Sequence, residues 1–228
     1  MKNGSLVKVG GASAILAGVS LGMMRVSGIF GIEGFDTTEE SLLYIADHLT
    51  VYLTQQSFML LTFLLVVPAA LGLHWALRQA GSVTVIATVA VMAGALIGVG
   101  SALLNLSLKA RLTPAYAEAD AATRLTLEVV YQTFIGVGPS HAVAWFLLAG
   151  IGVGLFSFAI LRTALLPKWI AWLGLFVALA GWLHLLTAVS DALWVLHEIK
   201  FDSFNLWTLA VGVALLRMRE PVKVDAGG

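Results

Sequence analysis

The amino-acid sequence predicts an all-α fold, a polytopic bundle of six transmembrane helices, and three observations lead to it. Hydrophobic residues make up 59% of the 228 residues and charged residues only 11%, against about 25% charged residues in soluble domains. The mean hydropathy is +0.93. Six long apolar runs divide the chain, and acidic and basic residues collect on opposite sides of them. A soluble core cannot absorb this much apolar surface, so we expect a single transmembrane domain over residues 1–228.

The apolar runs have the length of membrane spans. A helix needs about 20 residues to cross a hydrocarbon core about 30 Å thick. Because the runs lack the alternation of barrel strands, and because a bilayer leaves no water for unpaired backbone groups, helices are the expected elements. The last run is short, so we expect it to borrow preceding residues or to lie where the bilayer thins. The runs are approximately 9–32, 57–77, 83–107, 136–161, 169–190 and 203–217.

The charges between the runs orient the bundle. Of the 13 acidic residues, 11 fall in the connections on one side. Because cytoplasmic loops carry an excess of Lys and Arg, the opposite, basic side is predicted to be cytoplasmic, with both termini on it and an acidic outer face. The residues that set this orientation are Lys2, Lys8, Arg78, Arg162, Lys168, Arg217, Arg219 and Lys223.

Both longer outer connections are predicted to contain amphipathic helical segments. In the first, Thr37 and Glu40 have the spacing of a capping box. The helix that follows is expected either to lie on the membrane or to run directly into the second span.

In the second outer connection, Thr113 is expected to cap a helix that begins at Pro114. Arg124, Glu128 and Gln132 follow at i, i+4 spacing and predict a polar row along this segment. The side opposite this row is apolar, with Leu127, Val130 and Phe134.

Small residues predict which spans lie at the centre of the bundle. Lipid provides no hydrophobic drive between helices, so close approach depends on small side chains at the interface. The stripes are Gly11, Ala14, Gly18 and Gly22 in the first run, Ala90, Gly94 and Gly98 in the third, and Gly174, Ala178 and Gly181 in the fifth.

Polar residues inside the spans gather toward the outer side. A charge at the bilayer centre costs at least about 2.5 kcal/mol, so such residues suggest function. Arg25 lies about 24 Å from the cytoplasmic edge, counted from Val9 at 1.5 Å per residue. It is interpreted either as an inward cation that binds a carboxylate or phosphate, or as a side chain that reaches the outer headgroups.

Four of the five histidines also lie at or near the outer side. His184 is about 22 Å above the cytoplasmic edge, counted from Trp169, and Asp191 continues its helical face. The predicted ligand-binding residues of an outward-facing polar pocket are Arg25, Asn105, His141, His184 and Asp191.

The same outer residues suggest an alternative chemistry. Imidazole and carboxylate groups bind zinc, iron or copper, and two histidines on adjacent spans could hold a haem. Each histidine can equally be a hydrogen-bonded or solvated side chain without a ligand. The candidate metal ligands or their supporting partners are His48, His141, His184, His197, Asp47 and Asp191.

Other function classes find no support in the sequence. The net charge is zero and no basic cluster suited to nucleic acid is present. There is no cysteine for a disulfide, a thiolate metal site or a nucleophile. The chain lacks an H-E-x-x-H motif, a phosphate loop and a dinucleotide-binding glycine motif. A transporter is disfavoured because the inner half of the spans is nearly free of polar residues.

The fourth and fifth runs contain an apolar, glycine-bearing span, a short basic turn and the sequence LPKWIAWLG, which opens the next span. This stretch, residues 142–183, resembles a family of small six-span bacterial membrane proteins of unknown function. The resemblance implies a location in the bacterial inner membrane. It implies no activity, so it assigns no catalytic residue.

These observations favour a membrane component that binds a lipid or a protein partner, or that forms a homo-oligomer, through its outer side. The alternative is a metal or haem protein, redox-active or hydrolytic, acting at the outer side. A small transporter is the third hypothesis. The sequence does not decide whether the protein is an enzyme.

Overall fold

The computed structural model describes residues 3–29, 37–135, 139–183 and 194–218, and these residues form helices joined by short turns, without strands. The elements are α1 (Asn3–Ile29), α2 (Thr38–Asp47), α3 (Leu49–Ala76), the 3₁₀ turn η1 (Arg78–Ala80), α4 (Ser82–Glu118), α5 (Ala121–Ile135), α6 (Pro139–Trp145), the π-helical η2 (Phe146–Val153), α7 (Gly154–Thr163), α8 (Lys168–Leu183) and α9 (Trp194–Arg217).

Five helical stretches of the described chain are long and apolar enough to cross a membrane: Gly4–Ser27, Leu49–Ala76, Ser82–Glu118, His141–Thr163 and Glu198–Arg217. The last predicted run, 203–217, is therefore not short, because its helix begins at Trp194. Helix α8 is apolar but has only 16 described residues. The remainder of its predicted run, 184–190, lies outside the described residues.

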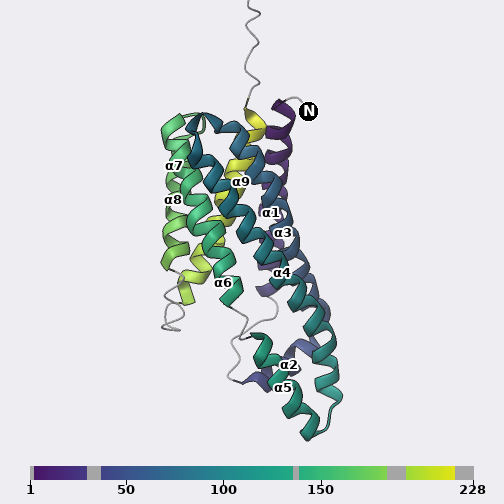
Figure 1. Cartoon of the computed structure of the whole chain (residues 1–228). Coiled ribbons are helices and arrows are strands. Elements are labelled where there is room, and N and C mark those ends of the chain that lie inside the picture. Colours follow the sequence, from purple (N-terminus) through teal and green to yellow (C-terminus); the bar gives the residue numbers. More distant parts are fainter. Residues whose placement is uncertain (1–2, 30–36, 136–138, 184–193, 219–228) are drawn as a thin grey trace, which may run out of the picture.

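The membrane-length helices form one bundle with two distinct ends (Figure 1). The start of α1, the end of α9, η1 and the turn between α7 and α8 lie together at one end. There Lys8 on α1 donates hydrogen bonds from Nζ to the carbonyl oxygens of Leu216 and of Met218, the latter at 2.8 Å. Carbonyl groups at a helix C-terminus lack partners within the helix, so Lys8 satisfies the end of α9.

At the other end of the bundle, α2 and α5 lie against an extension of α4 (Figure 1). Helix α4 has 37 residues, which corresponds to about 55 Å at 1.5 Å per residue and exceeds a bilayer core of about 30 Å. We call α2, α5 and the adjoining part of α4 the outer subdomain, and the end of the bundle next to it the outer end. Four of its buried residues, Leu42, Leu112, Tyr116 and Tyr131, form a cluster separate from the core of the bundle.

The capping residue predicted for the first outer helix is confirmed. The Thr37 side chain accepts a hydrogen bond from the backbone N–H of Glu40 at 3.2 Å, and α2 begins at Thr38. Helix α2 ends at Asp47 and α3 begins at Leu49. The connection is therefore a short separate helix, and the second span is a helix that begins before its predicted run.

The predicted start of the second outer helix is wrong. Thr113 and Pro114 lie inside α4, where the Thr113 hydroxyl donates to the Lys109 carbonyl at 2.8 Å. Helix α5 begins at Ala121 instead, and Asp120 accepts a hydrogen bond from the backbone N–H of Thr123 at 2.8 Å. Hydrogen bonds from the backbone and the side chain of Thr123 lower the pKa of the Asp120 carboxyl. Asp120 is a favoured N-cap residue, but the preceding Thr113 and Pro114 predict an earlier helix start.

The polar row of α5 makes contacts with α2 and α4. Arg124 contacts Glu39 on α2 at 3.5 Å, and Gln132 donates to Thr38 at 3.3 Å. Glu128 accepts a hydrogen bond from the hydroxyl of Tyr116 on α4. These polar contacts fasten α5 to its neighbours, whereas on the predicted apolar side only Leu127 packs against the buried cluster and Val130 and Phe134 are exposed.

All three predicted small-residue stripes lie at close helix contacts. An added Cβ at Gly11 would meet the Gly212 carbonyl oxygen at 3.0 Å, and one at Gly94 would meet the Ala144 carbonyl oxygen at 2.6 Å. Likewise, an added Cβ at Gly181 would meet the Gly150 nitrogen at 2.9 Å. The crossing of α1 and α3 is also close and involves two glycines outside these stripes, since a Cβ on Gly10 would lie 2.5 Å from the Gly72 Cα.

Candidate functional site

Arg25 lies on α1 at the outer end of the bundle and is paired with two carboxylates of α9. One of its guanidinium nitrogens contacts Glu198, and its Nε lies 3.3 Å from Asp202. The Arg25 side chain is one-third exposed, at 33%. A ligand that used Arg25 would have to compete with both carboxylates, so the predicted ligand role of this residue stays a prediction.

His141 begins the fourth span and is held by its own helix. Its Nε2 accepts a hydrogen bond from the indole N–H of Trp145 at 3.0 Å. This bond requires Nε2 to be unprotonated and available as an acceptor. The ring of Phe63 on α3 meets the His141 ring edge-on at 6.2 Å between centroids.

The other predicted residues that the structure describes make local contacts. Asn105 donates from Nδ2 to the Ser101 carbonyl at 2.9 Å. His48 hydrogen-bonds the Tyr44 carbonyl through Nδ1 at 3.0 Å and stacks on the Tyr44 ring. Asp47 and His48 are both exposed at the break between α2 and α3.

The metal hypothesis rests largely on residues that are not described. His184 and Asp191 lie outside the described residues, and His197 lies in α9 with its side chain outside them. Within 3–29, 37–135, 139–183 and 194–218, no group of three or more His, Cys, Asp or Glu side chains could hold a metal ion. The structure therefore brings His48 and His141 into no such group, and the remaining ligand sets stay predictions.

Lys200 is the feature that sequence reasoning missed. It lies on α9 between the two partners of Arg25, yet its side chain is fully buried, at 0% exposure. Its Nζ has no hydrogen-bond partner in the described structure. Two aromatic rings surround it instead, with centroids 5.2 Å away for Trp145 and 4.6 Å away for Phe201.

These rings belong to an aromatic layer across the outer part of the bundle, formed by Phe63, Trp145, Phe201 and Phe204. Trp145 is its centre: its ring centroid lies 4.6 Å from that of Phe201, 5.2 Å from that of Phe204 and 5.5 Å from that of Phe63. All four side chains are buried. The layer covers the core on the side of the outer subdomain.

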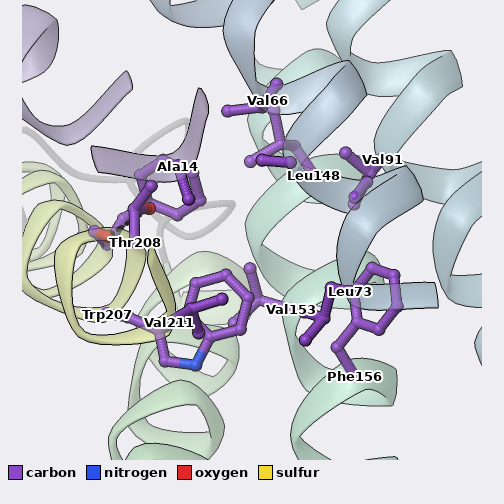
Figure 2. A pocket seen from close by; sticks show the side chains of 13 residues that line it. Ala14, Val66, Leu73, Val91, Leu148, Val153, Phe156, Trp207, Thr208 and Val211 are labelled. Atoms are coloured by element: carbon purple, nitrogen blue, oxygen red, sulfur yellow. Dashed lines mark hydrogen bonds between the residues drawn. The ribbon is translucent and has the colours of Figure 1, made fainter. Parts of the chain in front are cut away.

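An apolar cavity adjoins the aromatic layer and shares Phe204 with it. Figure 2 shows the side chains that line this cavity. It is partly open to the surroundings of the bundle, and together with that open part it measures about 360 Å³. Its accessible surface is entirely apolar, because the Trp207 indole nitrogen faces Gly174 on α8 instead. Five of the predicted spans contribute to its lining: Ala14, Val66, Ala69, Ala70, Leu73, Val91, Leu148, Val153, Phe156, Phe204, Trp207, Thr208 and Val211.

Helical periodicity places Lys200 and the cavity on one face of α9. Lys200, Phe204, Trp207 and Val211 follow one another at i, i+4, i+7 and i+11, the spacing of a single helical face. Three of these four residues line the cavity, and Lys200 lies one turn beyond them. The sequence carried this signal, but Glu198 and Asp202 on either side of Lys200 suggested an exposed segment.

Comparisons with protein-family models, curated proteins and solved structures give no match to this chain.

Proposed function

We propose that the protein is an inner-membrane component with six spans and cytoplasmic termini that binds a lipid acyl chain inside its helical bundle. The observation that carries this proposal is the apolar cavity between α1, α3, α4, α9 and the fourth span. An apolar pocket among the helices of a bundle is a common place for a small-molecule site.

The exposed surface of α8 supports its assignment as the fifth of six spans. One side of this helix packs on the core through Ile170, Val177 and Ala178. Its other side consists of large apolar side chains that are more than half exposed and suit contact with lipid, although Trp182 also meets the Phe146 ring edge-on. These side chains are Trp169, Trp172, Phe176, Leu179 and Trp182.

The arrangement of the ends supports the proposed orientation. Arg78, Arg162, Lys168 and Arg217 belong to elements at one end of the bundle, as the positive-inside rule requires of a cytoplasmic face. The acidic residues of α2 lie in the outer subdomain. The resemblance of residues 142–183 to a bacterial six-span family agrees with this arrangement, and association with a protein partner through the acidic outer helices stays a prediction.

Quenching of Trp207 tests the binding proposal. An acyl chain brominated near its middle quenches an indole that it touches, and Trp207 lines the cavity. We expect a saturable fluorescence decrease in the purified protein that is largely lost in Trp207→Phe. Because lipid around the bundle also quenches exposed indoles, Trp172→Phe serves as the matched control and should leave the saturable component in place. A saturable component that survives in Trp207→Phe contradicts the proposal.

A further inference from the structure

We infer that Lys200 binds the anionic headgroup of the ligand whose acyl chain occupies the cavity. The ligand class is then a long-chain amphiphile with a carboxylate or phosphate head. This inference rests on the proposed function and adds to it the chemistry of the ligand.

The Lys200 amine lacks, in the described structure, the partner that a buried cation requires. Lysine is almost never fully buried unless it is paired, and Lys200 is at 0% exposure without a hydrogen-bond acceptor. Burying an ammonium group away from water and from a counter-ion costs several kcal/mol. The rings of Trp145 and Phe201 offer a cation only the weaker attraction of their π faces. An anionic group at Nζ would supply the missing acceptor.

The two carboxylates nearest to Lys200 along α9 are already paired with Arg25. Glu198 and Asp202 precede and follow Lys200 by two residues, and residues two apart do not share a helical face. Both pair with Arg25 on α1. Lys200 instead faces the interior, where Trp145 of the fourth span packs against it. Among the described residues, Arg25 is thus a compensated cation, whereas Lys200 has no ion-pair partner.

Lys200 is aligned with the cavity along one face of α9. Phe204, one turn further along α9, both lines the cavity and contacts the Trp145 ring that faces Lys200. One helical turn rises about 5.4 Å. A chain in the cavity with its head beyond the aromatic layer would therefore place the head beside Nζ. If the Phe204 or Trp145 ring rotated, the part of the ligand that joins its head to its chain could pass through the aromatic layer.

A free anion does not fit this arrangement as well as an amphiphile does. A small anion at Lys200 would leave the cavity empty and would gain nothing from its apolar lining. An amphiphile combines the charge-assisted contact with packing of its chain against the apolar lining.

Three probes with the same sixteen-carbon tail test the headgroup. Palmitate carries a carboxylate, hexadecyl phosphate carries a phosphate and 1-hexadecanol is neutral. Their affinities are measured by competition with the brominated chain at Trp207, in a non-ionic detergent. We expect at least one anionic probe to bind about tenfold or more tightly than hexadecanol, as one charge-assisted hydrogen bond provides. The relative affinities of palmitate and hexadecyl phosphate distinguish a carboxylate ligand from a phosphate ligand.

Variants assign the preference to Lys200. Lys200→Gln should remove the preference for the anionic probe while hexadecanol still binds, and Lys200→Arg should keep a part of it. Lys168→Gln, which changes the net charge equally at an exposed position of the opposite end, should keep all of it. If Lys200→Gln does not fold, Lys200→Met, which fills the same space without a charge, takes its place.

The two proposals fail in different ways. Equal binding of all three probes, or an anionic preference that survives in Lys200→Gln or Lys200→Met, overturns the role of Lys200 and leaves the acyl-chain site standing. Absence of saturable binding for every probe overturns both.

Discussion

Arg25 on α1 and Glu198 on α9 form an ion pair at the outer end of the bundle. The pair joins the first and last described helices, whose contact continues inward through Gly18 beside Asn205 and Gly11 beside Gly212. Arg25 is therefore neutralised within the protein, whereas the buried Lys200 has no hydrogen-bond partner in the described part of the chain.

The coupling between Arg25 and Glu198 can be measured with a double-mutant cycle. Arg25→Gln, Glu198→Gln and the double variant should give a coupling free energy of about 1 kcal/mol, because both side chains are about one-third exposed. The free energy of unfolding is measured by detergent titration in mixed micelles. Arg217→Gln, at an exposed position of the other end, should change it little. Additive effects of the two substitutions would show that the ion pair contributes nothing.

The hydrogen bond between Tyr116 and Glu128 should hold α5 on α4. Tyr116 is fully buried, and its hydroxyl donates to the Glu128 carboxylate. Tyr116→Phe keeps the ring and removes the donor, so we expect α5 to lose about 1–3 kcal/mol of protection. Hydrogen exchange should accelerate in Ala121–Ile135 and stay unchanged in α1 and α9. Thr126→Ala, at an exposed position of α5, is the control, and equal exchange in both variants would contradict the role of this bond.

The proposed orientation can be tested directly because the chain contains no cysteine. A single cysteine at Thr123 on α5 should react with a membrane-impermeant maleimide in intact spheroplasts. A cysteine at Gln79 in η1 should react only after permeabilisation. Both positions are exposed, so access decides the result rather than burial. The reverse labelling pattern would invert the topology.

Metal analysis and an optical spectrum distinguish acyl-chain binding from the metal alternative. The binding proposal requires neither metal nor haem, so we expect substoichiometric metal and no Soret band in gently purified protein. Near-stoichiometric metal that is lost in His141→Ala or His184→Ala would support the alternative. Such a result would place ligands in the residues that the structure does not describe.

Much of the bundle could be predicted from its composition and its small residues. Long apolar runs require helices in a membrane, and glycine stripes mark close helix contacts, so the spans and the faces of Gly11, Gly94 and Gly181 follow from local sequence. The helix boundaries were less predictable. Thr113 and Pro114 carry a local start signal, but packing of Leu112 and Tyr116 in the outer subdomain continues α4 through them.

The candidate site was harder to predict because pairing depends on which helices meet. The sequence shows Arg25, Glu198 and Lys200 as three charges near one side, without indicating that α1 and α9 are neighbours. That contact neutralises Arg25 and turns Lys200 toward Trp145. The cavity has no local signal, since its lining consists of ordinary apolar residues from five spans.

Retention of an acyl ligand is the most direct measurement of the central claim. Native mass spectrometry of the purified protein counts bound lipids, and Val66→Phe or Val211→Phe fills the cavity from opposite sides. Val89→Phe makes the same change at a position of α4 that is 61% exposed. We predict one retained amphiphile per chain in the wild type and in Val89→Phe, and its loss in both cavity variants. Equal retention in all four proteins would show that the lipid binds elsewhere and would contradict the account.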